Sequence, residues 1–221
     1  MSIQSKTLQS EYANRFSQNV DYRQKVWKIL CDDFFSRYIA SGDTLLDLGA
    51  GWGEFTRNIR AGKKYTMDLN PDCGERVKGF SEFIMQDCSQ AWPIAKESLD
   101  LVFTSNFLEH LPGKDQVDKT LEQAFHALKA GGIIICLGPN ITYLPGLYWD
   151  YWDHFVPITD NSMVEALTLK GFEVERCVPK FLPYTMSGSR NPPLFLIRIY
   201  LRLPALWRIF GKQFLVVARK R

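Results

Sequence analysis

The sequence lacks three kinds of segment that would place it in a special class of protein. No run in its 221 residues approaches the ~18 uncharged apolar residues that a membrane-spanning helix needs. Residues 1–16 are polar and contain no apolar core of a secretory signal. The five cysteines lie far apart without a C-x-x-C pair, so we expect free thiols and neither a disulfide framework nor a metal site. These absences indicate one cytoplasmic domain of ordinary size.

Acidic residues are missing from the C-terminal part of the chain. Residues 176–221 hold ten of the 27 lysines and arginines and none of the 24 aspartates and glutamates. The preceding part is therefore net acidic, although the whole chain has a formal charge of +3. This asymmetry indicates an anionic partner for the basic segment, either a phosphorylated substrate or an anionic membrane surface.

Three glycines spaced two apart follow a short apolar run. Residues Leu45–Leu48 are typical of a buried strand, and Gly49, Gly51 and Gly53 come next. Residues Phe55–Ile59 then have helical spacing. A strand, a glycine turn and a helix form the first unit of a nucleotide-binding α/β sheet, because glycine lets the backbone approach a ligand. A tight turn without a ligand is the alternative.

The spacing of these glycines argues against a dinucleotide site. The fingerprint G-x-G-x-x-G requires a third glycine at position 54, where this chain has Glu54. A carboxylate at this position is unfavourable beside a pyrophosphate. The pattern Asp47-x-Gly49-x-Gly51-x-Gly53 instead resembles the first motif of class I S-adenosylmethionine (AdoMet)-dependent methyltransferases. AdoMet carries no phosphate, so this family tolerates an acid near the turn.

Two further aspartates continue the resemblance. Asp68 ends the second expected strand, close to the ~20-residue offset at which an acid binds ribose hydroxyls. The resemblance implies that Asp87 accepts a hydrogen bond from the adenine amino group and that the backbone of Cys88 faces the ring. The side chain of Cys88 can instead be an ordinary buried apolar group. We expect AdoMet to contact Asp47, Gly49, Ala50, Gly51, Gly53, Asp68, Leu69, Asp87, Cys88, Ser105 and Asn106.

Apolar periodicity predicts the remaining elements of a doubly wound sheet. Further strands are expected at 64–68, 83–88, 98–105, 133–137, 172–177 and 213–218, and helices at 21–40, 115–129, 161–170 and 194–203. Gly131-Gly132 is expected to end the helix before strand five, and residues 128–132 match the L-K-x-G-G segment of the methyltransferase family. The expected fold is α/β: a mostly parallel, seven-stranded, Rossmann-like sheet with an antiparallel last strand and a helical insertion before it.

One domain, residues 1–221, is expected, with four parts. Residues 1–42 form an N-terminal arm and helix, and residues 43–138 form the cofactor-binding half. Residues 139–177 and 213–221 complete the sheet and carry the substrate loop, and residues 178–212 form a basic amphipathic insertion. The leading helix either lies over the cleft, with Tyr12, Arg15 and Phe16 at the methionine end of the cofactor, or packs on the body as an arm.

Candidates for acid–base chemistry follow the fourth and fifth strands. Methyl transfer from a sulfonium is an in-line displacement, so positioning supplies much of the rate, and a hydroxyl acceptor usually also needs a base. His154 is the first candidate, with Asp153 beside it, and Glu109 and His110 are the others. Each of these side chains can instead be structural.

The acceptor is expected to contact the aromatic segment after strand five and the basic helix. Residues 143–152 are either an acceptor platform or a satellite core. Residues 194–203, followed by Pro204, predict a basic amphipathic helix that lies on a membrane, closes over a phosphorylated substrate, docks on a partner or packs as an ordinary helix. The expected acceptor contacts are Asn140, Tyr143, Trp149, Asp153, Arg198 and Arg202.

One short motif points to another acceptor, and we reject it. Residues Asn191–Leu194 resemble the N-P-P-Y signature of enzymes that methylate amino groups of nucleic acids. That signature belongs at the end of strand four, and its fourth residue should be an aromatic that stacks on a base. We therefore do not expect nucleic acid as a partner.

The resemblance to methyltransferases extends from Leu45 to Lys220. It implies an AdoMet-dependent enzyme that O-methylates a sugar or lipid-linked glycan, in the cytoplasm or at the inner face of the membrane. A small natural-product or quinone-type acceptor, and a non-catalytic AdoMet-binding or scaffolding protein, are the alternatives. The segments that are similar to a bacterial subgroup associated with surface glycan and glycolipid synthesis are Ser105–Leu111, Pro139–Asn140, Asp153–His154 and Gly211–Lys220.

Overall fold

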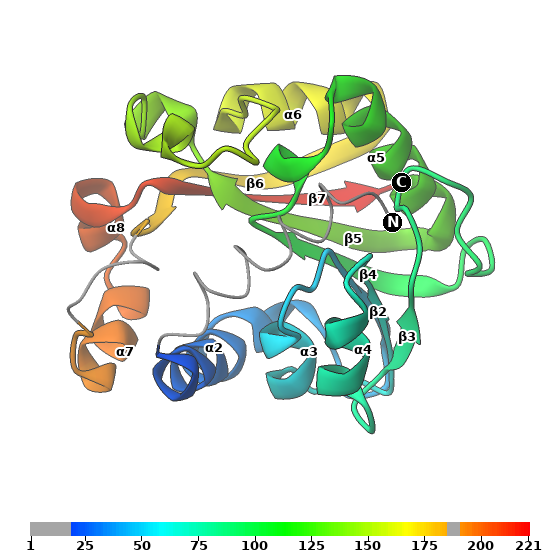
Figure 1. The fold of residues 1–221 in the computed structure, drawn as a ribbon, viewed down its shortest axis with the longest axis horizontal. Coiled ribbons are helices and arrows are strands. Elements are labelled where there is room, and N and C mark those ends of the chain that lie inside the picture. The colour runs from blue at the N-terminus through cyan, green and yellow to red at the C-terminus, as the bar shows by residue number, and fades with distance from the viewer. Residues whose placement is uncertain (1–18, 185–190) are drawn as a thin grey trace.

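Seven strands form one sheet in the order β3-β2-β1-β4-β5-β7-β6 (Figure 1). The structure is a computed structural model that describes residues 19–184 and 191–221. Strands β1 to β5 pair in parallel, whereas β7 is antiparallel to both of its neighbours, β5 and β6. The expected seven-stranded, mostly parallel α/β fold is confirmed. The strands are β1 (Thr44–Leu48), β2 (Lys63–Met67), β3 (Glu82–Ile84), β4 (Leu99–Ser105), β5 (Leu128–Pro139), β6 (Phe172–Leu182) and β7 (Gln213–Lys220).

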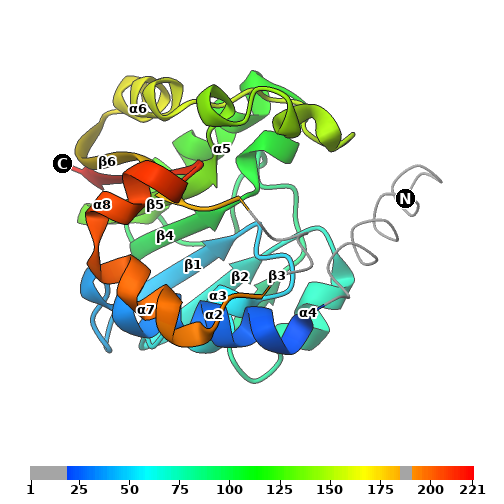
Figure 2. The ribbon, with the colours of Figure 1, turned by 90° about the vertical axis from the view of Figure 1, so that its left-hand side faces the viewer.

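Helices cover both faces of this sheet. Helices α5 and α6 lie on one face, and α2, α3 and α4 lie on the other (Figures 1 and 2). Helix α7 packs beside α2, and α8 contacts β6. The α-helices are α2 (Val20–Asp33), α3 (Glu54–Asn58), α4 (Pro71–Val77), α5 (Lys114–Ala127), α6 (Asp160–Leu169), α7 (Leu194–Arg202) and α8 (Pro204–Phe210), and the short 3₁₀ helices are η1 (Phe35–Tyr38), η2 (Leu108–His110), η3 (Ile141–Tyr143) and η4 (Leu147–Asp150).

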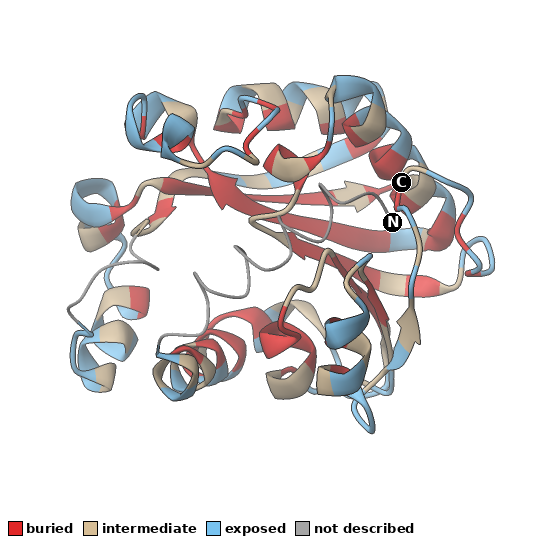
Figure 3. Cartoon of the chain, viewed as in Figure 1, coloured by how far each residue is buried: buried red, intermediate tan, exposed pale blue. Residues whose placement is uncertain are grey.

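The core consists of two apolar clusters, one on each face of the sheet. Successive strand residues point to opposite faces, so Leu45 belongs to the cluster under α2 and α3, while Leu46 belongs to the cluster under α5 and α6. The central strands are buried along their length (Figure 3). Their near-continuous apolar runs are those of a parallel sheet that is covered on both sides.

Helix α5 ends earlier than we expected. It stops at Ala127, and Leu128 already pairs with Leu99 of β4. The prediction that Gly131-Gly132 ends this helix is therefore wrong: both glycines lie within β5, and Gly131 has φ +81°. Sheet pairing competes with helix propagation here, because the backbone of Leu128 finds a partner in β4 instead of in the next helical turn.

The basic insertion is shorter than the sequence suggests. Strand β6 continues to Leu182, where it pairs with Gln213 of β7, so residues 178–182 belong to the sheet and only 183–212 form the insertion. Pro204 is the first residue of α8, a helix position that suits proline. In the part of the chain that the structure describes, no helix has the length and apolar character needed to cross a membrane.

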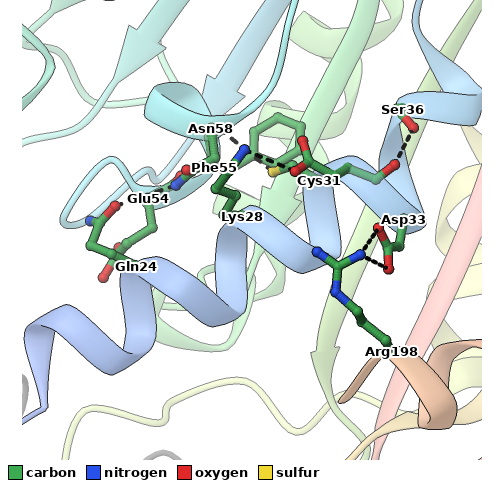
Figure 4. Close-up of polar contacts among 10 residues, drawn as sticks. Gln24, Lys28, Cys31, Asp33, Ser36, Glu54, Phe55, Asn58 and Arg198 are labelled. Carbon is green, nitrogen blue, oxygen red and sulfur yellow. Dashed lines mark hydrogen bonds and ion pairs between the residues drawn. The ribbon is translucent and has the colours of Figure 1, made fainter. Parts of the chain in front are cut away.

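Helix α2 links the first βα unit to the insertion. It ends at Asp33 and not near Ala40, and η1 follows. Arg198 of α7 donates hydrogen bonds to both carboxylate oxygens of Asp33, at 3.0 and 3.1 Å (Figure 4). On the other side of α2, Asn58 of α3 donates to Gln24 at 3.3 Å. The residues predicted to cap the cofactor from the N-terminus, Tyr12, Arg15 and Phe16, lie outside the described residues.

Candidate functional site

The glycine turn adopts a backbone that other residues rarely take. Gly49, Gly51 and Gly53 have φ values of +68°, +56° and +69°, which lie in the left-handed region that favours glycine. A Cβ on Gly49 would lie 2.0 Å from the ring of Phe107, and one on Gly53 would lie 2.3 Å from Val77. At these two positions both the conformation and the available space require glycine.

Asp47 holds this turn against α3, the helix that follows it. Its Oδ2 accepts hydrogen bonds from the hydroxyl of Thr56 at 2.6 Å and from the amide of Thr56 at 3.2 Å. Burial raises the pKa of Asp47 to about 7, although the bonds from Thr56 lower it. The hydroxyl of Thr56 lies 2.9 Å from that of Thr66 in β2. Asp47 therefore connects β1, α3 and β2 beneath the turn.

Asp68 stands at the end of β2 and faces the glycine turn. Its Oδ2 accepts from the amide of Gly51 at 2.7 Å, and its Oδ1 accepts from the amide of Asn70 at 2.8 Å. Burial raises the pKa of Asp68 above its ordinary value, and these backbone donors lower it. Each carboxylate oxygen has more than one acceptor position, so the same group can hold the turn and accept from a diol. Leu69, beside it, is exposed.

The predicted adenine contacts lie further along the sheet edge. Strand β3 ends at Ile84 and not at Cys88 as we expected, which leaves Asp87 exposed in a turn. Its Oδ1 accepts from the amide and the hydroxyl of Ser89, both at 2.8 Å. The thiol of Cys88 is buried 3.2 Å from the hydroxyl of Thr120, in the position of a core residue. The adenine-binding role of Asp87 stays a prediction.

One pocket opens at the carboxyl ends of β1 and β4. Its cavity volume is about 140 Å³, and it is open to solvent on one side. Eight of the residues that we expected to function line it: Asp47, Gly49, Ala50, Ser105, Asn106, Glu109, His110 and His154. Nine further residues line the pocket and were not predicted from the sequence: Arg23, Trp27, Trp52, Glu54, Phe55, Phe103, Tyr151, Tyr184 and Gln213.

A buried ion pair forms part of the pocket wall. Arg23 of α2 donates from Nε to Oε1 of Glu54 at 2.9 Å, and a second guanidinium nitrogen bonds the same oxygen. The guanidinium also lies 5.1 Å from the ring centroid of Trp52. Glu54 occupies the position where a dinucleotide site has its third glycine, and Arg23 neutralises it. The only sequence signal was the unexpected acid, because nothing local connects it with a residue 31 positions earlier.

Three of the acid–base candidates meet in this pocket. Glu109 and His110 belong to η2, directly after β4, and His154 lies in the loop after η4. The rings of His110 and His154 are 4.8 Å apart, edge to face. The loop is held in place because the amides of Phe155 and Val156 donate to the carbonyl of Glu109, at 2.9 and 3.1 Å.

Burial acts on the acid of this cluster. Glu109 is buried, and this burial raises the pKa of its carboxyl while the neighbouring His110 lowers it. The Nε2 of His110 lies 4.0 Å from Oε1 of Glu109. On the other side of the ring, Nδ1 lies 2.8 Å from the carbonyl oxygen of Asp153 and 3.4 Å from its carboxylate. A carbonyl only accepts, so Nδ1 of His110 carries a proton.

The expected acceptor residues are not gathered at this pocket. Asn140 is buried, and its side-chain amide donates to Asp160 at 2.8 Å and to the carbonyl of Pro179 at 3.1 Å. Asn140 therefore ties the end of β5 to α6 and β6. Tyr143 lies on a separate groove, with the ammonium of Lys180 5.2 Å from its ring centroid.

The aromatic segment divides into a buried and an exposed part. Tyr148 is fully buried, and its hydroxyl donates to the carbonyl of Val156, so it belongs to a satellite core. Trp149 and Trp152 are 53% and 85% exposed. In the insertion, Arg198 pairs with Asp33, whereas Arg202 is exposed to solvent.

Comparison with known proteins agrees with the site. Residues 46–136 match a protein family described as "Methyltransferase domain". Among curated proteins no match was found. A chain of the complex between the Trm112 methyltransferase activator and a methyltransferase of Haloferax volcanii is similar to this chain, with 18% identity, a TM-score of 0.67, and coverage of 96% of this chain and 94% of that one.

Two further solved structures share the fold. A SAM-dependent methyltransferase from Archaeoglobus fulgidus has 19% identity and a TM-score of 0.65, with coverage of 93% of this chain and 99% of that one. A geranyl diphosphate methyltransferase in complex with SAM has 13% identity and a TM-score of 0.64, with coverage of 95% and 90%. The fold is that of class I methyltransferases, and the matched domain contains the glycine turn and Asp68. Residues 46–136 therefore carry a match to a methyltransferase domain, and the chain has the fold of SAM-dependent methyltransferases.

Proposed function

We propose that this protein transfers the methyl group of AdoMet to a hydroxyl oxygen of a sugar or a lipid-linked glycan. One observation carries the proposal: Glu109, His110 and His154 gather in the pocket that Gly49, the first glycine of the turn, also lines. AdoMet is expected on the turn side of this pocket, with its ribose at Asp68. The acceptor then lies between the methyl group and the acid–base cluster.

The chemistry requires a group that takes the acceptor proton. A hydroxyl is a weak nucleophile, so its proton must leave as the oxygen attacks the methyl carbon and the carbon–sulfur bond breaks. Buried Glu109 and the two imidazoles are of the right kind, because a base works best with a pKa near the working pH. Burial moves the pKa of Glu109 upward, towards that range.

The preference for a sugar acceptor rests on the pocket lining and on the resemblance. The aromatic rings of Trp27, Tyr151 and Tyr184 line the same pocket, and aromatic faces pack well against sugar rings. The segments Ser105–Leu111 and Asp153–His154, which carry the resemblance to glycan-modifying methyltransferases, supply the cluster itself.

The test is to identify the methylated product. The protein is incubated with AdoMet carrying an isotopically labelled methyl group, together with glycans and lipid-linked glycans from a cell extract, and products are searched by mass spectrometry for an added labelled methyl. We expect label on a sugar oxygen. Label on phenolic or quinone-type metabolites would overturn the choice of acceptor. AdoMet binding without transfer to any component would favour the non-catalytic alternative.

A lipid-linked acceptor would bring the protein to a membrane, and helices α7 and α8 are suited to that place. They expose six large apolar side chains, and Arg202 and Arg208 are exposed among them. Such a combination is typical of a helix that lies in the interface of an anionic membrane. We therefore place the enzyme in the cytoplasm, peripheral to the inner face of the membrane. The exposed apolar residues are Phe195, Leu196, Ile199, Leu203, Ile209 and Phe210.

Reversing the charge of Arg202 and Arg208 should weaken binding to anionic vesicles. Each basic residue near the surface contributes about 1 kcal/mol, so Arg202→Glu with Arg208→Glu is expected to lower binding by roughly 30-fold or more. Sedimentation with phosphatidylglycerol vesicles at low salt measures this binding. Lys114→Glu with Lys119→Glu makes the same charge change on α5, on the opposite face of the sheet, and should have a much smaller effect. Wild-type protein that ignores these vesicles at low salt would contradict the membrane placement.

A further inference from the structure

The acid–base cluster has the composition of a metal site. Glu109, His110 and His154 each offer one ligand atom, and these atoms all lie within 4.8 Å of one another. The set contains two imidazoles and one carboxylate, which is a donor set for divalent transition metals in proteins. Glu109 and His154 are buried, and His110 is partly buried, so the atoms converge inside the pocket and not on the surface.

The orientation of His110 suits metal binding. Its Nδ1 donates to the carbonyl of Asp153 at 2.8 Å, which leaves the lone pair of the neutral ring on Nε2. Nε2 is also the nitrogen that lies nearer to Glu109, 4.0 Å from Oε1. Metal-binding histidines usually donate their other ring N–H to a carbonyl or a carboxylate in this way, and the carboxylate of Asp153 lies 3.4 Å from the same Nδ1.

The two segments that carry the ligands are fixed relative to each other. The carbonyl of Glu109 accepts from the amides of Phe155 and Val156, so the loop of His154 is bonded directly to the residue that supplies the carboxylate. The ring of Tyr148 also packs against that of His154, with their centroids 4.7 Å apart. A site whose ligands are held before binding needs little ordering when the ion arrives.

We propose that Glu109, His110 and His154 bind one divalent transition-metal ion, such as Zn²⁺ or Mn²⁺. Three protein ligands leave coordination positions open towards the pocket, where Tyr151 and Asn106 also lie. No metal site was predicted from the sequence, because the cysteines lie far apart, whereas this set joins η2 to a loop more than 40 residues later.

This inference deepens the proposed function and rests on it for the role of the ion. A hydroxyl bound to a divalent cation has a lowered pKa. The coordinated acceptor would lose its proton to water, its oxygen would attack the methyl carbon of AdoMet, and the carbon–sulfur bond would break to release S-adenosylhomocysteine. In this arrangement His154 would hold the ion and would not itself take the acceptor proton.

Titration with Co²⁺ tests the site without any use of methyl transfer. Chelator-treated full-length protein is titrated with Co²⁺, and the visible absorption and the heat of binding are followed. We expect one equivalent, displaced by Zn²⁺. Because even loss of a residue that only supports a ligand lowers metal affinity about 10–100-fold, Glu109→Gln and His154→Ala should each weaken binding by about 100-fold or more. The matched control is His126→Ala, which removes an exposed histidine of α5.

AdoMet affinity, measured on every variant, shows that the fold is retained. Absence of a Co²⁺ signal from the wild type, or a signal that persists in both Glu109→Gln and His154→Ala, would overturn the metal site. Methyl transfer that continues at full rate in excess chelator would also overturn the metal site, but it would leave the proposed function intact. Specific metal binding without transfer to any sugar would leave the site standing and refute the proposed acceptor.

Discussion

His154→Ala is expected to lower the turnover number by roughly 10²–10⁴ and to leave the affinity for AdoMet unchanged. His154 is buried in the pocket, with its ring 4.8 Å from that of His110. Alanine removes one of the groups that take the acceptor proton or hold the ion that lowers the pKa of the acceptor hydroxyl. The glycine turn and Asp68 are untouched, since they lie on other elements.

Single-turnover measurement of methyl transfer, together with calorimetric titration of AdoMet, separates these two effects. His126→Ala is the matched control, because it removes a half-exposed histidine on α5 that lines no part of the pocket. Turnover within a few-fold of the wild type would remove His154 from the mechanism. The search for the essential group would then move to Glu109 and His110.

Asp68→Ala is expected to weaken AdoMet binding about 10–100-fold, which corresponds to roughly 1.4–2.8 kcal/mol. Two contributions are lost together. The carboxylate is the expected acceptor of the ribose hydroxyls, and it also accepts from the amide of Gly51 at 2.7 Å, so alanine would also loosen the turn.

Two further variants distinguish these contributions by calorimetry. Asp68→Asn keeps one carbonyl oxygen for the amide of Gly51 and should fall between the wild type and alanine. Asp72→Ala removes an exposed carboxylate in the first turn of α4 and should bind AdoMet like the wild type. Unchanged affinity in Asp68→Ala would show that the ribose is held elsewhere.

Local sequence predicted the cofactor half of the protein well. The turn at Gly49, Gly51 and Gly53 could be predicted because the left-handed backbone region favours glycine, and all three positions adopt that conformation. The buried strands β1 and β4 could be predicted because short, mostly apolar runs are typical of strands in a sheet that is covered on both faces. The ends of the elements were harder to predict. Helix α5 stops at Ala127 because the backbone of the next residue, Leu128, pairs with β4.

The expected roles of polar side chains depended on partners that local sequence does not reveal. Asn140 was expected at the acceptor, but it bonds Asp160 and Pro179 and joins three elements. Arg198 was expected to face an anionic ligand, but it pairs with Asp33 of α2. In both cases the partner is distant in the chain, and only packing brings it within hydrogen-bonding distance.

By itself the sequence determined the seven strands of an α/β sheet, the glycine turn and the acid after β2, because each depends on the pattern of a few consecutive residues, and the resemblance carried by that turn implied the cofactor class. Only the tertiary structure decided what surrounds the reacting group. It paired Arg23 with Glu54 and brought His154 to Glu109 and His110. These contacts join loops and helices whose relative positions are set by the two apolar clusters on the faces of the sheet, and apolar packing is not directional enough for a single sequence to specify which distant polar groups will meet.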